Sequence, residues 1–377
     1  MQFSCNQDTF SKYLNIVSRI VSSKPGLPIL NNVMFETSKG KLMMTATDLE
    51  VGIHCWIGAE VRAEGKTTIP ARQLSEFVHS VNADKVDGLL DNQVFTVSTP
   101  NNYAKFNTTV ADDFPTIGAI KAEKPLLRIS KEDVIDAVSK VAFSAAKDDV
   151  KPVLTGVRIE IEDDVMAFVA ADGLRLSRYV VRLSTPIKDS IELLVPAKAF
   201  EELARILTDF SQDEVDDEYV DFYLLEDKNQ VLFRFNDIDL VSRLIDGQFP
   251  DYKAIIPSTH QTTCSFSKVD FQNSLKVVSI IARSVLGNKT ILKVDPKKKT
   301  VTMSASQADV GSNQSVFDAE VDGDSIEMAF SSRFLTDFLT NAAGEEIEFE
   351  CNTPVSPGVF KIKGNDSYIH LIMPMRL

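Results

Sequence analysis

The stretch TTIPARQLSEFVHS (residues 67–80) returns twice along this 377-residue chain, as ELLVPAKAFEELAR (192–205) and SIEMAFSSRFLTDF (325–338). Each copy reads as a short apolar strand, a turn of small residues, a basic residue and an amphipathic helix. The basic residue is Arg72, Lys198 or Arg333. Repetition at a long, nearly constant step is typical of a chain built from copies of one structural unit. The pattern therefore predicts three similar domains.

Other landmarks keep the same order in all three units. An aspartate follows an apolar strand in each unit, at Asp48, Asp172 and Asp309. A pair ending in proline closes each unit, at Phe114-Pro115, Phe249-Pro250 and Met373-Pro374. A helix is expected near the start of each unit, over residues 9–23, 131–147 and 269–283. We predict domain boundaries at residues 1–123, 124–256 and 257–377.

The pattern inside a unit predicts an α+β fold. Phe10, Tyr13, Leu14 and Val17 form an apolar stripe with helical spacing. Segments such as VMFET (33–37) and VLFRFND (231–237) alternate between apolar and polar residues, as half-buried strands do. Turn signals such as Pro-Gly and Asp-Gly separate them. Each domain is expected to have two helices on one side of antiparallel sheet.

The net charge of −14 is distributed unevenly. Acidic residues crowd segment 212–227, whereas residues 9–35, 137–147 and 271–294 contain lysine and arginine but no acidic residue. One interpretation is that any amphipathic helix has a charged outer face. The other is that the helices of three domains face a common centre and form a basic lining. Such a lining would hold duplex DNA by topology and let it slide, because phosphate contacts carry no sequence preference.

Composition argues against several other classes of protein. No apolar run is long enough to span a bilayer, and the first residues lack the pattern of a signal peptide, so a cytoplasmic protein is expected. Cys5, Cys55, Cys264 and Cys351 lie far apart and only four histidines accompany them, so we expect buried thiols, no metal and no cofactor. None of the motifs of nucleotide binding, metalloproteases or serine hydrolases occurs. An enzyme is therefore not expected, and the alternative is a scaffold that binds proteins but no DNA.

Eight short segments in the same order resemble one known family. They are KPGLPIL (24–30), TDLE (47–50), IPARQL (69–74), ADDFP (111–115), ADGLRLS (171–177), VPAKAF (195–200), LIDGQFPDY (244–252) and MPMRL (373–377). With the threefold repeat, they resemble the beta subunit of bacterial DNA polymerase III, the sliding-clamp family, over the full length. The resemblance implies the DNA clamp fold and a head-to-tail homodimer whose domains close a ring around duplex DNA.

The same resemblance implies a processivity factor that tethers partners by short peptides. The implied partners are the DNA polymerase III catalytic subunit, the clamp loader, other polymerases, ligase and mismatch-repair proteins. The implied location is the cytoplasm, in association with the nucleoid. No membrane contact is implied.

Three sets of site residues follow. The resemblance implies a peptide-binding pocket between the second and third domains, formed by Leu154, Asp172, Gly173, Arg175, Leu176, Pro250, Ile255, Val355, Leu371, Ile372, Met373, Pro374, Met375, Arg376 and Leu377. The residues expected to face DNA are Arg19, Lys24, Arg72, Lys140, Lys147, Lys198, Arg205, Lys276 and Arg283. The residues implied at the dimer interface are Phe106, Ile280 and Ile281.

Two features bear on the pocket. The terminal HLIMPMRL is apolar almost to its last residue, which favours a docked strand over a frayed tail. Lys151, Ala171, Leu174 and Ala254 depart from the residues common in the family, so the sequence leaves the preferred peptide open.

Overall fold

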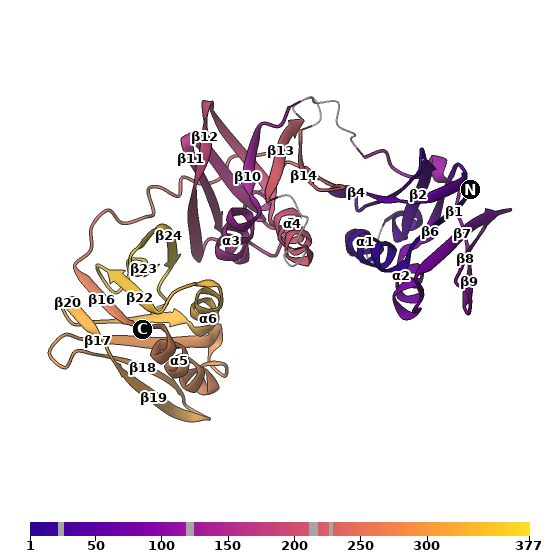
Figure 1. Ribbon diagram of the computed structural model, residues 1–377. Helices are drawn as coiled ribbons and strands as arrows, with labels where there is room; N and C mark the ends of the chain where they lie inside the picture. Colours follow the sequence, from indigo (N-terminus) through magenta and orange to yellow (C-terminus); the bar gives the residue numbers. More distant parts are fainter. Residues whose placement is uncertain (22–25, 118–123, 211–217, 226–228) are drawn as a thin grey trace. The chain divides into compact units, whose positions relative to one another are not determined.

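The computed structural model describes residues 1–21, 26–117, 124–210, 218–225 and 229–377 (Figure 1). Its internal contacts divide the chain into two compact units. The first contains Met1–Glu132 and Glu202–Leu244, and the second contains Asp133–Glu201 and Ile245–Leu377. Residues of the predicted central domain are thus shared between the two units. The domain boundaries inferred from the sequence stay a prediction.

The first unit contains two antiparallel sheets. The smaller has the order β5-β1-β7-β8-β9, from β5 (Glu60–Ala63), β1 (Gln2–Asn6), β7 (Lys85–Asp91), β8 (Val94–Ser98) and β9 (Tyr103–Asn107). The larger has the order β10-β13-β14-β15-β4-β3-β2-β6, from β10 (Leu127–Ser130), β13 (Tyr219–Leu225), β14 (Gln230–Phe235), β15 (Ile238–Arg243), β4 (Val51–Gly58), β3 (Lys41–Thr47), β2 (Asn32–Ser38) and β6 (Gly65–Pro70). Helices α1 (Gln7–Ile20) and α2 (Ala71–Ser80) lie side by side (Figure 1). Short 3-10 helices are η1 (Pro28–Asn31) and η2 (Ala111–Asp113).

The second unit also contains two antiparallel sheets. The larger has the order β11-β12-β24-β23-β22-β16-β20, from β11 (Gly156–Ala171), β12 (Arg175–Pro196), β24 (Asn365–Ile372), β23 (Gly358–Ile362), β22 (Glu346–Cys351), β16 (Thr262–Ser267) and β20 (Glu320–Gly323). The smaller has the order β19-β18-β17-β21, from β19 (Gly311–Asp318), β18 (Thr300–Gln307), β17 (Lys289–Asp295) and β21 (Ile326–Ser331). Helices α5 (Lys268–Ala282) and α6 (Ser332–Asn341) contact each other. The 3-10 helices are η3 (Ala142–Ser144), η4 (Pro152–Leu154) and η6 (Leu286–Asn288).

Helices α3 (Lys131–Val141) and α4 (Ala197–Asp209) contain two of the three points at which the chain passes from one unit to the other, and the third follows Leu244. Each third of the described chain thus contains two helices and antiparallel strands, so the predicted α+β class with two helices per domain is confirmed.

The start of α1 shows how the sequence sets a helix boundary. The side chain of Asn6 accepts a hydrogen bond from the Thr9 backbone N–H at 2.9 Å, which caps the first turn. Phe10, Leu14 and Val17 then lie on one buried face. Phe10 packs edge-on against Phe35 of β2, with ring centroids 5.8 Å apart. The helix is therefore held to the sheet by an aromatic core.

Two of the three predicted helices have different bounds in the structure. The helix expected over residues 9–23 begins at Gln7, because Asn6 is the cap, and ends at Ile20. The helix expected over residues 131–147 ends at Val141 and continues as the single 3-10 turn η3. Lys147 therefore lies beyond the helix. The third expectation, 269–283, agrees with α5 to within one residue at each end.

Each larger sheet crosses a predicted domain boundary by one strand pair. In the first unit β15 pairs with β4, with Leu240 opposite Ile53. In the second unit β24 pairs with β12, with His370 opposite Ser177. Backbone hydrogen bonding thus continues from one predicted domain into the next, which makes these two junctions parts of a sheet rather than loose linkers.

Candidate binding surfaces

The aspartates repeated in the sequence cap hairpin turns in two of the three units. The Asp172 carboxylate accepts hydrogen bonds from the backbone N–H groups of Leu174 and Arg175, at 2.9 and 3.0 Å. Asp48 accepts from Glu50 and Val51 in the same way, at 3.1 and 2.8 Å. Asp309 lies in a hairpin with a loop one residue shorter, because Gln307 pairs with Gly311. Asp48 and Asp172 are therefore turn-capping residues.

Gly173 gives the second turn its shape. Its φ is +90°, a conformation that side chains rarely adopt, and a Cβ added there would meet no atom within 4 Å. The turn therefore presents backbone and the 57% exposed side chain of Leu174 to solvent.

Arg175 follows this turn and is buried. Its guanidinium donates to Asp172 at 3.0 Å, to Asp337 of α6 at 2.5 Å and to the backbone carbonyl of Phe143 at 2.7 Å. The group also lies 4.6 Å from the centroid of the Phe334 ring. Arg175 thus ties the turn to α6 and to η3. All three nitrogens are used within the described chain, so this residue holds the surface in shape.

A buried polar chain lies beside Arg175. His370 Nδ1 is 2.7 Å from Ser177 Oγ, which is 2.8 Å from Ser144 Oγ. The imidazole stacks on Phe338 with centroids 5.3 Å apart. Burial, and then the neighbouring charge of Arg175, lowers the pKa of His370 to about 3, so the ring is neutral.

An apolar cluster of the second unit brings together part of the predicted pocket. Leu154, Leu176 and Leu371 are buried in one cluster with Phe249, Tyr252 and other apolar residues. Tyr252 donates its hydroxyl to Glu160 at 2.8 Å. Burial, and then Glu160, raises the pKa of Tyr252 to about 12.

The other predicted pocket residues lie nearer the surface, with one exception. Ile372 is fully buried in the core of the C-terminal third. Those exposed to solvent are Gly173, Pro250, Ile255, Val355, Met373, Arg376 and Leu377. Those partly buried are Asp172, Pro374 and Met375. The predicted set therefore divides into an apolar base and exposed residues that a partner could contact.

The last residues are docked, as the apolar pattern predicted. The Met373 N–H donates to the carbonyl of Leu174 at 2.8 Å, and the Met375 N–H donates to the carbonyl of Ala329 at 2.7 Å. The Met375 methyl group lies 2.5 Å from the position that a Cβ on Gly287 would take. A side chain at position 287 would therefore require the flexible Met375 side chain to move.

Most of the predicted DNA-facing residues are displayed on the surface. The exposed members are Arg72, Lys147, Lys198, Arg205, Lys276 and Arg283. Arg72 pairs with Glu76 on the next turn of α2, at 2.9 Å. Such an exposed pair is weak and competes poorly with a phosphate. Exposed Arg205 also lies 3.6 Å from Glu202. Lys24 lies outside the described residues.

Two other predicted DNA-facing residues are both largely shielded from solvent and paired with the chain's own carboxylates. The Arg19 guanidinium pairs with Glu202 at 2.6 Å and with Asp209 at 2.9 Å. Lys140 is only 4% exposed, and its ammonium lies 2.5 Å from Asp136 and 4.4 Å from the Tyr179 ring centroid. Neither residue presents a free positive charge to a phosphate in this structure.

The predicted dimer-interface residues lie on different elements. Phe106 is half-buried on β9 and contacts the Phe77 ring with centroids 6.4 Å apart. Ile280 on α5 is 68% exposed, whereas its neighbour Ile281 packs against the core of the C-terminal third. Strand β9 is an edge of its sheet, and so is β19.

The four cysteines are free and buried, as predicted. Burial raises the pKa of Cys5, Cys264 and Cys351 to about 12, so these thiols are unreactive. No cluster of three or more metal-ligand side chains occurs in the part of the chain that the structure describes. None of the described helices is long and apolar enough to cross a membrane.

Sequence reasoning missed Asp337, Phe143 and His370. Their contacts with Arg175 and Ser177 join residues far apart in the chain. No local motif signals such pairs. The one available signal was a histidine within a strongly apolar strand, because a buried imidazole needs a hydrogen-bonding partner.

Three family models match consecutive parts of the chain. They are described as the N-terminal, central and C-terminal domains of the DNA polymerase III beta subunit, and they match residues 1–118, 128–251 and 253–376. Together they span nearly the whole chain in the order that the repeats predicted.

Curated relatives match along their full length. A beta sliding clamp of Synechococcus elongatus is 29% identical over 384 residues, covering 100% of both chains. A beta sliding clamp of Staphylococcus aureus is 25% identical, covering 100% of this chain and 99% of the relative.

Solved structures share the fold. The DNA polymerase sliding clamp of Bacillus subtilis is 24% identical with a TM-score of 0.93, covering 100% of this chain and 99% of that one. The DNA polymerase III beta subunit of Pseudomonas aeruginosa is 25% identical with a TM-score of 0.91, covering 100% of both chains. The predicted three-domain clamp fold is confirmed.

Proposed function

The chain belongs to the DNA polymerase III beta subunit family, and from that premise we propose that it is a sliding clamp, a processivity factor for DNA polymerase. In this role two copies close a ring around duplex DNA and tether the polymerase to it. The protein then works by topology and attachment and catalyses no reaction itself. The observation that carries the proposal is the pair of matching sheet junctions, because the strands equivalent to those that form them, β9 and β19, are edges of their sheets in the described chain.

The two internal junctions have the same register. Gly52 and Leu176 are each the first paired residue after a hairpin, opposite Thr47 and Ala171 respectively. Gly52 lies opposite Val241, and Leu176 lies opposite Leu371. One rule thus describes both junctions: the hairpin strand of one domain pairs with the last strand of the next.

The same rule applied a third time predicts how two copies meet. In the C-terminal third the first paired residue after the hairpin is Gly311, opposite Gln307. In the first third the last strand is β9, and its neighbour β8 contains the segment VFTV (94–97). The strands next to the last strands of the other two thirds contain similar segments, LFRF (232–235) on β14 and VFKI (359–362) on β23. Val94 pairs with Asn107, as Leu232 pairs with Val241 and Val359 with Leu371. We therefore infer that Asn107 of one copy lies opposite Gly311 of the other.

This pairing gives each interface residue a neighbour. Counting along the strands from Asn107, Phe106 lies opposite Ser312 and Lys105 lies opposite Asn313. Asn313 also donates to the backbone carbonyl of Val277 at 2.8 Å, which joins β19 to α5. The exposed Ile280 is on that helix, so the interface combines strand pairing with an apolar contact.

The basic residues support the DNA part of the proposal. Arg72 and Arg205 are exposed on helices α2 and α4, and Lys276 is exposed on α5. Helix side chains that contact only phosphates would hold the duplex weakly and without sequence preference, as sliding requires. Lys147, Lys198 and Arg283 complete the exposed set. Because Arg19 and Lys140 are paired with carboxylates, we expect smaller effects from replacing them.

The peptide site rests on the surface around the Asp172 turn. Leu174, Ile255, Val355 and Met373 are exposed apolar side chains. The Met373 N–H donates to the carbonyl of Leu174, two residues before the buried Leu176, and the Ile255 N–H donates to the carbonyl of Tyr252, which belongs to the same buried cluster. A short peptide that inserts a few apolar side chains suits such a surface. We propose the polymerase catalytic subunit, the clamp loader, other polymerases, ligase and mismatch-repair proteins as the partners. The proposed location is the cytoplasm, in association with the nucleoid.

A retention experiment tests the proposal. The purified dimer is loaded by a bacterial clamp loader onto nicked circular DNA, and the DNA is then cut once. A sliding clamp stays on the circle through gel filtration and leaves the linear molecule. Equal retention on both forms would mean direct binding instead of encirclement. Absence from both forms would favour a protein scaffold that does not bind DNA.

A further inference from the structure

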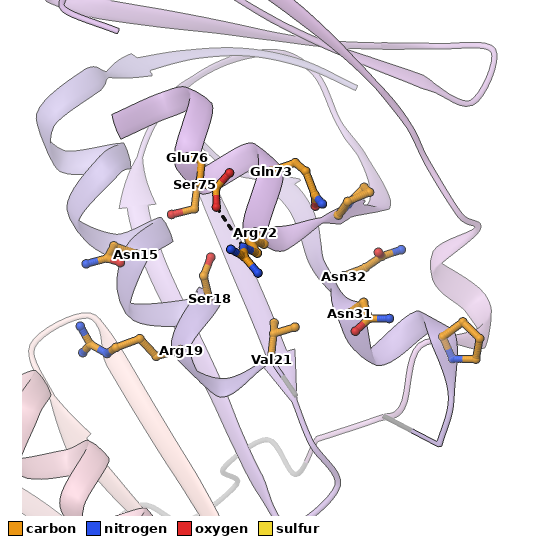
Figure 2. A pocket seen from close by; sticks show the side chains of 12 residues that line it. Asn15, Ser18, Arg19, Val21, Asn31, Asn32, Arg72, Gln73, Ser75 and Glu76 are labelled. Atoms are coloured by element: carbon orange, nitrogen blue, oxygen red, sulfur yellow. Dashed lines mark hydrogen bonds and ion pairs between the residues drawn. The ribbon is translucent and has the colours of Figure 1, made fainter. Parts of the chain in front are cut away.

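A cavity of about 700 Å³ lies in the first unit, apart from the proposed peptide site. Figure 2 shows it between α1 on one side and η1 with the first turns of α2 on the other. Its lining residues are Asn15, Ser18, Arg19, Val21, Pro28, Asn31, Asn32, Pro70, Arg72, Gln73, Ser75 and Glu76. This volume is in the range of small-molecule sites, which bury ligands of nucleotide size.

The lining is rich in side-chain amides. Asn15 is on α1, Asn31 and Asn32 are at η1, and Gln73 is on α2. Asn32 is already bonded to Thr68 Oγ1 at 3.0 Å. The amides of Asn15 and Gln73 have no hydrogen bond within the described residues and both are exposed. An amide offers a donor beside an acceptor, which is the pattern that the edge of a nucleobase presents.

One buried atom at the cavity lacks a partner. Ser18 Oγ is shielded from solvent and makes no hydrogen bond within the described chain. Ser18 lines the cavity, and in Figure 2 its side chain points toward the Arg72 guanidinium, whereas the guanidinium of Arg19 points away from these residues and pairs with Glu202 and Asp209. Buried polar groups are nearly always satisfied, so the Ser18 hydroxyl indicates a polar ligand or water in this space.

The charges of the side chains around the cavity favour a nucleic acid over a peptide as the ligand. Residues 9–35, which supply η1 and all of α1 except its first two residues, contain no acidic residue, and the one acidic residue of α1 is Asp8 in its first turn. The one carboxylate in the lining, Glu76, is paired with Arg72. The 83% exposed Arg72 side chain can leave that weak pair for a phosphate, since a charge-assisted bidentate contact is stronger. The rings of Pro28 and Pro70 add apolar surface beside the amides.

We propose that this cavity binds one unpaired nucleotide of a DNA strand, with its base among the amides of Asn15 and Gln73 and its phosphate at Arg72. The inference rests on the proposed function, because a clamp on DNA meets unpaired nucleotides wherever primed template is single-stranded. It extends that function by a contact with the base, which duplex sliding does not need. The cavity would then distinguish a strand that has bases from one that has only the backbone.

Equilibrium binding of two labelled oligonucleotides tests the proposal. A thymidine decamer and an abasic decamer of the same length are titrated with the full-length protein at one fixed low salt concentration, by fluorescence anisotropy. We expect the thymidine decamer to bind about tenfold more tightly, since losing the base removes roughly 1.4 kcal/mol of contact. Equal affinity for both decamers would overturn the proposal.

Variants test whether the preference for the thymidine decamer over the abasic decamer arises at the cavity. The double change Asn15→Ala with Gln73→Ala should abolish the preference for the thymidine decamer. The matched control, Gln272→Ala with Asn273→Ala, changes two exposed amides on α5 and should keep it. Arg72→Gln should weaken both decamers and leave their ratio unchanged. If the cavity double variant keeps the preference, or loses affinity for a polymerase-derived peptide instead, the site is not a nucleotide site.

The retention experiment separates this proposal from the proposed function. The cavity double variant should remain on nicked circular DNA as well as the unchanged protein does. A thermal melt confirms that the variant is folded. Failure of the unchanged protein to stay on the circle would contradict the clamp function, whereas loss of retention by the cavity variant alone would assign the cavity to duplex binding and overturn this inference.

Discussion

Arg175, which the family resemblance implied as a residue of the peptide pocket, is buried beside the Asp172 turn. Its three guanidinium nitrogens are bonded to Asp172, Asp337 and Phe143. A buried guanidinium with this many partners is costly to disturb, because each carboxylate or carbonyl would be left unsatisfied. Under the proposed function we therefore expect Arg175 to act on peptide binding by positioning the turn, and the exposed Leu174 to be the better candidate for contact.

His370 predicts how the stability of the second unit depends on pH. Its pKa is lowered to about 3, by burial first and by Arg175 second, whereas an exposed histidine in the unfolded chain has a pKa of about 6.5. As pH falls below about 6.5, His370 binds a proton in the unfolded chain, whereas in the folded protein it binds one only near pH 3. The free energy of unfolding should therefore fall in this window, by about 1.4 kcal/mol per pH unit from this group.

The change His370→Gln tests this assignment. Glutamine keeps a hydrogen-bonding group near Ser177 but does not titrate. Urea unfolding of both proteins at pH 7.5 and pH 5 should show a smaller loss of stability for the variant, by roughly 1–2 kcal/mol. Carboxylates contribute equally to both proteins, so they cancel in the comparison. The same loss in both proteins would contradict the role of His370.

Strand edges determine where the chain can join another copy. Among the described strands, β9 and β19 are edges of their sheets. The strands equivalent to β9 in the other two domains are β15 and β24, and those equivalent to β19 are β4 and β12. Inside the chain β15 pairs with β4, and β24 pairs with β12. An open edge strand exposes unpaired backbone groups and favours pairing with another chain. The internal junctions thus indicate which edges meet as well as their register.

Engineered cysteines test the inferred register. Lys105→Cys with Asn313→Cys places two thiols directly opposite each other across two copies, at a Cβ separation of about 4.5–5.5 Å. We expect a disulfide-linked species on non-reducing gels after mild oxidation. The control, Lys105→Cys with Ser312→Cys, is shifted by one residue and places the thiols on opposite faces of the sheet. Cross-linking of the control but not of the first pair would show another register. The four native cysteines are buried and do not interfere.

The neighbours Ile280 and Ile281 on α5 predict two separable effects. Ile280→Ala removes an exposed apolar side chain and should weaken the dimer at low micromolar concentration with little change in the melting temperature. Ile281→Ala removes a side chain packed against the core and should lower stability by about 1–3 kcal/mol. Sedimentation velocity and thermal melts measure the two effects. A fully dimeric double variant would rule out this helix as part of the interface.

At the scale of the whole molecule, the compact units do not follow the repeats. The repeats and the family models describe three domains, whereas the contacts divide the chain within α3 and α4. The reason is that each larger sheet continues across a junction, so strands of the central domain pair with strands of its neighbours. The sequence repeats show that the three domains share one pattern. The division into two compact units instead reflects hydrogen bonds between strands of neighbouring domains.

Removing the tail tests the peptide site at this scale. Deletion of residues 373–377 should lower affinity for a polymerase-derived peptide by roughly 2–4 kcal/mol, enough to remove micromolar binding. The lost hydrogen bonds to Leu174 and Ala329 should cost only about 1–2 kcal/mol of stability. Calorimetric titration beside a thermal melt measures both. Unchanged peptide affinity would contradict the site, and a collapsed melt would make the tail structural.

A point variant complements the truncation. Leu176→Asp is unsuitable because Leu176 is only 3% exposed and a carboxylate there would unfold the apolar cluster. Leu174→Asp places the charge on the exposed side chain of the same turn. We expect it to abolish peptide binding while the melting temperature changes little.

The sequence alone determined the features that repeat or follow a local pattern. The three copies of the strand, turn and helix, the Asp48 and Asp172 turns, and the apolar faces of α1 and α5 could all be recognised because each depends on residues close together in the chain. The helix ends were less accurate, since nothing in the pattern showed that Asn6 would cap α1 or that α3 would stop at Val141.

Only the tertiary structure decided which functional groups are available. Arg19, Lys140 and Arg175 were expected at binding surfaces just as Arg72 was. Folding largely shields the first three and pairs them with carboxylates, whereas the Arg72 side chain stays exposed beside Glu76. It also placed Ser18 at a cavity and Leu176 in a core. Burial and ion pairing arise from residues brought together across long stretches of chain, and no local pattern encodes such distances.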